Sequence, residues 1–425
     1  MAERILAGRR GGILSWCLYD WAMSAYNTVI GTFIFSVYFT RAVADSEVAG
    51  TAQWGRAVAL SGLAVAVLSP VLGAIADRGG RRKPWLALFT ALTVAGTALL
   101  WFVKPDPSSV MLALVLVGLT NVTFELANVF YNAMLPGLAP PGHTGRVSGW
   151  GWGLGYVGGL GCLVISLFGL VQTETPLFGL LGTGEQANVR ATALLVALWY
   201  GVFSLPLFLV TPDQAGTGVS IGAAVRDGIK ALIETLRQIR RYGNVARWLV
   251  ASALYRDGLN TLFAFGGIYA AGTFGMGFDQ IVMFAIALNV TSAAGAFGFA
   301  WIDDWIGPKR TILGCLVGLI GFGIPLLFAE SQQAFWILAL GLGVFVGPAQ
   351  AAGRTMMAKL APSGMETEMF GLYALSGRAV SFVGPLLLAW ATESFQSQRA
   401  GMATIVLLLL LGFVLLFAVR EERGT

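Results

Sequence analysis

Twelve long apolar runs constrain the fold of this chain more than any other feature. A helix that crosses a bilayer needs about 20 mostly apolar residues. Runs of that kind lie at residues 13–39, 54–76, 84–103, 108–134, 147–171, 191–211, 248–274, 280–302, 311–329, 333–354, 369–391 and 400–419. Since 56% of the 425 residues are hydrophobic and the mean hydropathy is +0.74, a water-soluble fold is excluded. The sequence predicts an all-α membrane protein with twelve transmembrane helices.

The basic residues occupy the short breaks between these runs. If both termini lie inside, 20 of the 27 Lys and Arg residues fall in inside segments, five fall in outside loops, and Arg256 and Arg378 fall within helices. Short cytoplasmic loops carry an excess of Lys and Arg, so we expect both termini in the cytoplasm. A nucleic-acid-binding protein would gather its basic residues on a soluble face, so nucleic acid is not an expected partner.

The longest break divides the chain into two sets of six runs. We therefore expect an N-terminal six-helix bundle at 1–211, a cytoplasmic linker at 212–247 and a C-terminal six-helix bundle at 248–425. Within the linker, apolar residues recur at three- and four-residue steps with basic residues between them: Ile221, Val225, Ile229, Leu232, Leu236 and Ile239. This pattern predicts an amphipathic helix along the cytoplasmic membrane face. A plain solvated linker helix is the alternative.

The two halves carry the same short motifs in the same order. "LAPPG" at 138–142 recurs as "LAPSG" at 360–364, and this offset of 222 also relates Gly149 to Gly371 and Gly155 to Gly377. "DRGGRRK" at 77–83 lies over "DWIGPKR" at 304–310 with an offset of 227, and Leu18-Tyr19 lies over Leu254-Tyr255 with an offset of 236. The two bundles are therefore expected to be pseudo-symmetric copies.

The charged loop of this repeat resembles a known signature. "GAIADRGGRRK" at 73–83 is similar to the major facilitator superfamily pattern G-x-x-x-D-R-x-G-R-R/K between helices 2 and 3, and "AWIDDWIGPKR" at 300–310 resembles its weaker second copy. The resemblance implies the major facilitator fold and a gating loop in which Asp77 faces the start of helix 11 in the outward-open state. The candidate gating residues are Gly73, Asp77, Arg78, Gly80, Arg81, Arg82, Asp304, Gly307, Lys309 and Arg310. The alternative is that these cations only fix the topology.

Four longer stretches narrow the resemblance within that superfamily. They are "YDWAMSAYNTVIGTFIFSVYF" at 19–39, "YNAMLPGLAPPGHTGRVSGWGWGLGYVGG" at 131–159, "YRDGLNTLFAFGGIYA" at 255–270 and "GPLLL" at 384–388. Together they resemble the vacuole-effluxer-like group, which is related to the autophagy-associated amino-acid exporter of fungal vacuoles. Met23 stands where that pattern has Asn. The resemblance implies transport, and we expect a bacterial plasma-membrane location.

Polar side chains within the apolar runs point to a transport path. An ionisable residue in a spanning helix costs about 2.5 to 3.5 kcal/mol on insertion scales and needs a partner, water or a function. In the resembled fold, helices 1, 4, 7 and 10 line the central cavity. The candidate substrate and coupling residues are Tyr19, Asp20, Ser24, Asn27, Asn121, Glu125, Asn128, Tyr131, Tyr255, Arg256, Asp257, Asn260, Gln350, Arg354 and Arg378. We expect Asp20, Glu125 and Arg378 to form the functional centre; structural ion pairs that lock the two halves are the alternative.

Other kinds of chemistry find no support in the sequence. Cys17, Cys162 and Cys315 lie inside apolar runs without metal-like spacing. "GLGYVG" at 153–158 has no strand before it, and Gly151, Gly155 and Gly159 indicate a helix-packing face instead. We therefore expect no metal, no cofactor and no enzymatic activity.

The expected function is secondary transport by two rocking bundles. The solute is expected to be small and polar or zwitterionic, with amino acids among the candidates and protons as the candidate coupling ion. We expect a monomer surrounded by membrane lipid. An exporter of amphipathic solutes is the first alternative, because 27 Phe and 13 Trp residues would suit an apolar pocket. A non-transporting membrane receptor or scaffold is the second.

Overall fold

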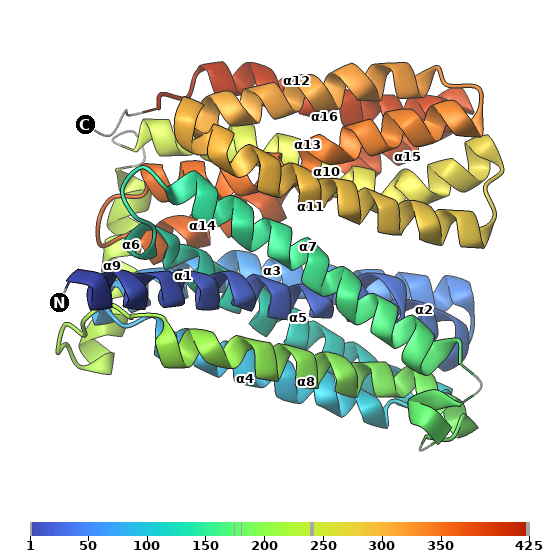
Figure 1. Cartoon of the computed structure of the whole chain (residues 1–425), viewed down its shortest axis with the longest axis horizontal. Helices are drawn as coiled ribbons and strands as arrows, with labels where there is room; N and C mark the ends of the chain where they lie inside the picture. Colours follow the sequence, from blue (N-terminus) through green and yellow to red (C-terminus); the bar gives the residue numbers. More distant parts are fainter. Residues whose placement is uncertain (1, 174, 180, 239–241, 422–425) are drawn as a thin grey trace. The chain divides into compact units, whose positions relative to one another are not determined.

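The computed structural model is helical and describes residues 2–173, 175–179, 181–238 and 242–421 (Figure 1). Within these residues, eleven helical segments are long and apolar enough to cross a membrane. They match eleven of the twelve predicted runs. The remaining run lies in α10 (Gly243–Phe274), whose 32 residues are long enough to span a bilayer. Its hydropathy is lowered by Arg247, Arg256 and Asp257.

The N-terminal half contains the first six predicted spans. The first is built from α1 (Ala2–Ala25), the π-helical η1 (Tyr26–Phe33), α2 (Phe35–Tyr38) and η2 (Phe39–Val43). It is followed by α3 (Glu47–Gly79), α4 (Lys83–Leu99), η3 (Leu100–Phe102), η4 (Pro107–Ser109) and α5 (Val110–Ala133). After these come α6 (Leu135–Leu138), α7 (Thr144–Ser166), η5 (Leu167–Val171), η6 (Pro176–Gly179), η7 (Gly184–Gln186) and α8 (Ala187–Val210).

The C-terminal half follows the linker helix α9 (Ile221–Arg237) and α10. Its further helices are α11 (Phe278–Ile306), α12 (Pro308–Leu327), α13 (Gln332–Leu360), α14 (Glu366–Val380), α15 (Val383–Phe395) and α16 (Gln398–Phe417). The run predicted as continuous at 369–391 is therefore interrupted at Ser381 and Phe382. Pro385 accounts for the break, because its ring clashes with the carbonyl four residues earlier and it has no N–H to donate.

The chain forms two compact units that do not follow the two halves of the sequence. The first unit comprises Met1–Leu68, Gly80–Met134 and Leu154–Gly216, and the second comprises Ser69–Gly79, Leu135–Gly153 and Thr217–Thr425. The second unit thus contains the end of α3 and the start of α7 together with helices of the C-terminal half. This grouping places several candidate gating residues in one unit.

Glycines let α7 approach α1 closely in the first unit. A Cβ on Gly158 would clash with the carbonyl oxygen of Trp21, and one on Gly159 would lie 2.6 Å from the Thr28 hydroxyl. Gly155 faces Ser24 in the same way. The predicted packing face is therefore confirmed at Gly155 and Gly159, and Gly158 adds to it.

The linker helix α9 belongs to the second unit and packs on its other helices. It lies crosswise to α10 and α11 (Figure 1), and Ala224, Leu232 and Thr235 are buried. A Cβ on Gly228 would lie 2.8 Å from the backbone of Ile75, so α9 touches the end of α3 directly. The helix itself is as predicted, whereas its place on a membrane face stays a prediction. The predicted side chains of Ile221, Leu236 and Ile239 lie outside the described part.

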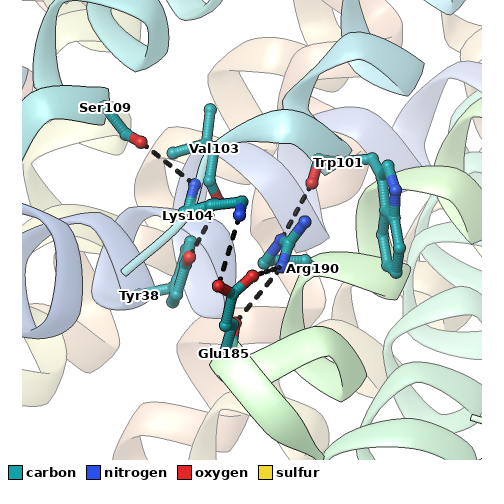
Figure 2. A network of polar contacts seen from close by, with 7 residues as sticks. All are labelled: Tyr38, Trp101, Val103, Lys104, Ser109, Glu185 and Arg190. Atoms are coloured by element: carbon teal, nitrogen blue, oxygen red, sulfur yellow. Dashed lines mark hydrogen bonds and ion pairs between the residues drawn. The ribbon is translucent and has the colours of Figure 1, made fainter. Parts of the chain in front are cut away.

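Polar contacts tie the segment after α4 to the start of α8 in the first unit (Figure 2). We call the four residues that make them, Trp101, Lys104, Glu185 and Arg190, the brace. Arg190 is 6% exposed. Its Nε donates to the Trp101 carbonyl at 2.8 Å, and its guanidinium lies 4.7 Å from the centre of the Trp101 ring. Glu185 approaches Lys104 Nζ at 3.2 Å and Arg190 Nη1 at 3.5 Å. The brace therefore anchors the loop before α8.

Candidate functional site

A polar stripe runs along α5 in the first unit. Asn121, Glu125, Asn128 and Asn132 are all half-buried, while their neighbours Phe124, Ala127 and Val129 are buried. Residues three and four apart share one helix face, so the stripe faces away from the apolar core of the unit. Asn132 Nδ2 donates to Asn128 Oδ1 at 2.8 Å, which links two of its members.

Hydrogen bonds join α5 to two other helices. The Tyr131 hydroxyl donates to Asp20 Oδ2 at 3.1 Å, connecting α5 to α1. Asn121 Nδ2 donates to Ser61 Oγ on α3 at 2.6 Å. Asp20 is 8% exposed. Asp20 of α1 is therefore bonded to α5 at the residue before Asn132, beside the stripe.

Asn27 and Ser24 continue the polar region along the first span. Ser24 is half-buried, and Asn27 is exposed near the start of the π-helical η1. The wider turn is visible in the bond from Thr32 Oγ1 to the carbonyl of Asn27, five residues earlier, at 3.0 Å. π-helical turns inside α-helices are frequent at functional sites.

The aromatic residues expected near a ligand are packed in the core instead. Tyr19 and Tyr131 are fully buried. The Tyr19 hydroxyl bonds to Thr90 at 2.6 Å and to Tyr200 at 2.8 Å. The Tyr19 ring stacks on Tyr131 at 5.0 Å, and Tyr131 stacks on Trp16 at 4.3 Å. These rings offer no open face to a solute in this conformation.

Two adjacent charged residues of α10 have different surroundings in the second unit. Arg256 lies over the Tyr373 ring at 4.0 Å, and its Nη1 donates to the Tyr373 carbonyl at 3.2 Å. Asp257 is 2% exposed and accepts a hydrogen bond from the backbone N–H of Gly384 at 2.7 Å. Asn260, one turn further on, is exposed.

The other predicted residues of the second unit separate into two groups. Gln350 and Arg378 are half-buried, and Tyr255 is fully buried. Arg354 is 4% exposed and binds the start of α7, where its Nε donates to Ser148 Oγ at 2.9 Å and its Nη2 to the Ser148 carbonyl at 2.6 Å. Arg354 therefore holds α7 and α13 together.

Asp77, at the end of α3, binds the N-terminus of α14. Its Oδ1 accepts from the N–H of Thr367 at 3.1 Å and its Oδ2 from the N–H of Glu368 at 2.8 Å. A carboxylate is favoured there by the helix dipole and by free N–H groups. A Cβ on Gly73 would lie 2.5 Å from the Thr367 carbonyl, so glycine permits this approach. The predicted contact of Asp77 with this helix start is present.

Asp304 makes the matching contact at the start of α7. Its Oδ1 accepts from the N–H of Arg146 at 3.2 Å, and its Oδ2 lies 3.2 Å from Arg146 Nε. Arg146 corresponds to Glu368 by the 222-residue offset, as Asp304 corresponds to Asp77 by 227. The repeat therefore extends to the contacts themselves. We call Asp77, Asp304 and the two helix starts that they bind the latch.

Two cations of the gating loops bind helix C-termini. Arg82 is 2% exposed, and its Nη1 donates to the carbonyl of Ala133 at the end of α5 at 2.7 Å. Its counterpart Lys309 donates from Nζ to the carbonyl of Val419, beyond the end of α16, at 2.6 Å. Cations are favoured at helix C-termini. These residues therefore stabilise helix ends, whichever side of the membrane they occupy.

The remaining gating residues shape the two loops or lie at the surface. Gly80 and Gly307 have φ angles of +82° and +90°, the left-handed region that glycine adopts without strain. Arg78, Arg81 and Arg310 are exposed. The two loops thus share their backbone turn as well as their sequence pattern.

Several residues in these contacts were not predicted, among them Asp213, Ser148 and Tyr373. Asp213 accepts from the N–H groups of Arg82 at 3.1 Å and Lys83 at 3.2 Å, capping the start of α4. Its position just after an apolar run was an available signal, because an acid there is close to the next helix start. Ser148 and Tyr373 carry no such signal, since their partners are distant in sequence.

Comparison with known proteins identifies the family. Residues 9–425 match the model of the family described as vacuole effluxer Atg22 like. The chain belongs to this Atg22-like family. An uncharacterized MFS-type transporter of Bacillus subtilis, YxiO, is 30% identical over 419 residues, which are 97% of this chain and 95% of that protein.

More distant relatives of this Atg22-like protein are fungal. Autophagy-related protein 22-1 of Neosartorya fischeri is 24% identical over 305 residues, 66% of this chain. The aligned part spans about half of that fungal protein, 48% of its length. These relatives and the family match make the chain a multi-pass membrane protein of the MFS transporter type.

Solved structures confirm the predicted fold. The major facilitator transporter FucP in its outward conformation matches with a TM-score of 0.72 and 12% identity, covering 96% of this chain and 99% of FucP. The proton:xylose symporter XylE bound to 6-bromo-6-deoxy-D-glucose matches with a TM-score of 0.74 and 14% identity, covering 97% and 96%. The Atg22-like chain thus has the major facilitator fold, with twelve spanning segments in two six-helix bundles, α10 included.

Proposed function

We propose that this protein is a secondary transporter that moves a small polar or zwitterionic solute, with amino acids as the leading class, by alternating access coupled to protons. The observation that carries the proposal is the polar stripe of α5 with Asp20 bound beside it. An apolar solute would need no such stripe. A zwitterion has a cationic group for a carboxylate and an anionic group for an arginine, and both residue types lie within the spanning helices.

The packing of the aromatic residues supports a polar solute over an amphipathic one. Trp16, Tyr19 and Tyr131 are fully buried and stacked on one another. In the second unit, Trp248 is fully buried and stacks on Tyr373 at 6.1 Å. These rings stabilise helix contacts instead of lining an apolar pocket, so they do not favour the drug-like alternative.

The latch supports alternating access. Asp77 belongs to the N-terminal half and binds a helix of the C-terminal half, while Asp304 does the reverse. Such contacts close one end of a two-bundle transporter and must break when that end opens. In the proposed topology this end is cytoplasmic, and the latched arrangement excludes the solute from that side.

The test is uptake by purified protein in lipid vesicles. Labelled mixtures of amino acids, of hexoses and of lipophilic cations are offered separately, with and without an imposed pH gradient. We expect accumulation of amino acids that depends on the gradient. Asp20→Asn and Glu125→Gln remove a charge with little change in volume. Each should lower uptake by about tenfold or more, the effect of losing a charged hydrogen-bond partner.

The matched control is Asp45→Asn, because Asp45 is exposed and lies between the first two spans. It should transport like the unmodified protein. If Asp20→Asn and Glu125→Gln both keep full uptake and pH dependence, the intramembrane carboxylates are structural and the site assignment is wrong. Accumulation of lipophilic cations alone would favour the amphipathic alternative.

A further inference from the structure

The break between α14 and α15 lies against a buried carboxylate. Because Pro385 interrupts the helix, the N–H of Gly384 lies in the first turn of α15 without a helical acceptor. It donates instead to Asp257 Oδ2 of α10 at 2.7 Å. Asp257 is 2% exposed, and its other oxygen, Oδ1, has no hydrogen-bond partner in the described structure. Oδ2 of this carboxylate therefore caps the start of α15, and Oδ1 accepts no hydrogen bond in the described structure.

An ionised carboxylate in this place is unfavourable, since burying a charge without full compensation is costly. On α10 itself, Arg256 is directed to the Tyr373 ring. The charged and titratable residues with described side chains on the other helices packed against α10 are Asp303 and Asp304 on α11, Arg354 and Lys359 on α13, Glu366, Glu368, Tyr373 and Arg378 on α14, Glu393 on α15 and Arg399 on α16. Within the described residues, none of them bonds to Asp257. The neighbouring α16 contributes Ile405 and Leu408 near Gly258.

The surroundings favour a proton over a metal ion as the neutralising cation. Metal cations such as Ca²⁺ and Mg²⁺ need about six or more oxygen ligands. Beside Asp257 the structure offers the N–H of Gly384, which is a donor, and the Thr261 hydroxyl, which donates to the Asp257 carbonyl at 2.8 Å. A proton needs one oxygen, and Oδ1 supplies it.

We propose that Asp257 is the site at which this transporter binds its coupling proton. The inference rests on the proposed function and deepens it, because it assigns the coupling ion to one atom. A proton from water adds to Oδ1, the carboxylate becomes a neutral acid, and release returns the proton to water. Asn260 lies one turn away on α10 and is exposed, and we assign the proton's approach to Asp257 to this side of the helix.

The helix break gives the proton a mechanical effect. A hydrogen bond to a charged acceptor is about twice as strong as one to a neutral acceptor, so protonation weakens the hold of Asp257 on the start of α15. The opposite end of α14 carries Thr367 and Glu368, which the latch holds through Asp77. The non-helical step at Ser381 and Phe382 then acts as a hinge between a proton site and the latch.

The equivalent positions of the N-terminal half, all of them described, do not repeat this arrangement. By the repeat offsets, Asp257 corresponds to Trp21 and Gly384 to Cys162, which lies inside the uninterrupted α7. The broken helix and the carboxylate therefore occur together in one half, and neither occurs at the equivalent described positions of the other. This pairing supports a shared role over chance proximity.

The decisive variant is Asp257→Asn, whose side-chain oxygen still accepts from Gly384 but cannot bind a proton. Infrared difference spectra of the full-length protein in nanodiscs report the carbonyl stretch of a protonated carboxylic acid. We expect a band that appears on acidification in the unmodified protein and in Asp20→Asn, and that is lost in Asp257→Asn. Asp257→Glu keeps an ionisable group, so its band should persist at a shifted frequency. This variant provides the test if Asp257→Asn does not fold. A spectrum without any band assignable to Asp257 overturns the proposal.

Vesicle transport provides the second readout with the labelled amino-acid mixture. Asp257→Asn should lose accumulation driven by the pH gradient and keep solute exchange. Unchanged accumulation in this variant, or accumulation in the unmodified protein driven by a sodium gradient alone, overturns the proton assignment. If the unmodified protein moves no amino acid, the proposed function fails, and the infrared titration still decides whether Asp257 binds a proton.

Discussion

Single carboxylates at helix N-termini determine whether the latch holds. Asp77→Asn keeps one acceptor oxygen, but it replaces the other with an NH2 group that faces an N–H donor and it removes the charge. Since a carboxylate at a helix N-terminus contributes about 0.3 to 2 kcal/mol, the ratio of closed to open molecules should fall by up to about thirtyfold. Asp304→Asn should have a similar effect, and the two should add because they act on different helices.

The opening can be measured at Ala352, which is 1% exposed and lines a small hollow between α7, α11 and α13. A cysteine there should react slowly with a maleimide in the unmodified background and faster in Asp77→Asn. The contrary result is normal expression with an unchanged labelling rate in both single variants and in the double variant. It would mean that Asp77 and Asp304 do not stabilise the closed state.

At the residue scale, sequence reasoning succeeded where a motif specifies a contact and failed where a partner is distant. The G-x-x-x-D pattern predicted Asp77 at the start of α14, because the glycine and the carboxylate are both needed for that approach. Arg354 was assigned to the solute path from its position on a cavity-lining helix. Its partner Ser148 lies 206 residues away, and no spacing in the sequence reveals such a bond. Asp257 was found as a charge, but its pairing with Gly384 was not.

At the scale of elements, the brace should contribute measurable stability to the first unit. Arg190→Lys keeps the charge but loses the bond from Nε to Trp101 and the flat guanidinium that stacks on its ring. We expect a loss of about 1 to 3 kcal/mol, typical of removing a buried hydrogen-bond partner, and a thermal midpoint lower by several degrees. Thermal unfolding of the purified protein in detergent measures it.

Lys104→Gln is the control within the same brace. Lys104 and Glu185 are 57% and 56% exposed as side chains, and exposed ion pairs contribute about 0 to 1 kcal/mol. Its thermal midpoint should stay close to that of the unmodified protein. Equal shifts of the thermal midpoint in the two variants would mean that the burial of Arg190 does not account for the stability that the brace contributes.

Helices were predictable because apolar length is a strong signal, whereas their interruptions were not. The twelve runs gave every spanning segment, including α10, whose charges lower its hydropathy. The break before α15 was missed because Pro385 lies inside an apolar run. In such a run, a kinked helix and an interrupted helix have the same sequence pattern. The π-helical η1 was missed for a similar reason, since Tyr26–Phe33 has no residue that distinguishes a wider turn.

At the scale of the whole molecule, the topology awaits a direct test. Single cysteines at Ser108 and Gln186 should react with a membrane-impermeant maleimide in intact cells, and one at Ser220 should react only after permeabilisation. All three positions are exposed, and the native cysteines Cys17, Cys162 and Cys315 are buried, so background labelling should be low. The reverse pattern would invert the proposed orientation.

The exchange of partners within the latch has a consequence for the origin of the molecule. In a symmetric homodimer, a residue i of one copy contacts residue j of the other, and j contacts i in return. The latch follows that rule inside one polypeptide, with Asp77 and the start of α7 supplied by one half and Asp304 and the start of α14 by the other. This reciprocity is what the joining of two copies of one six-helix unit would produce, since each copy would bring one aspartate and one helix start.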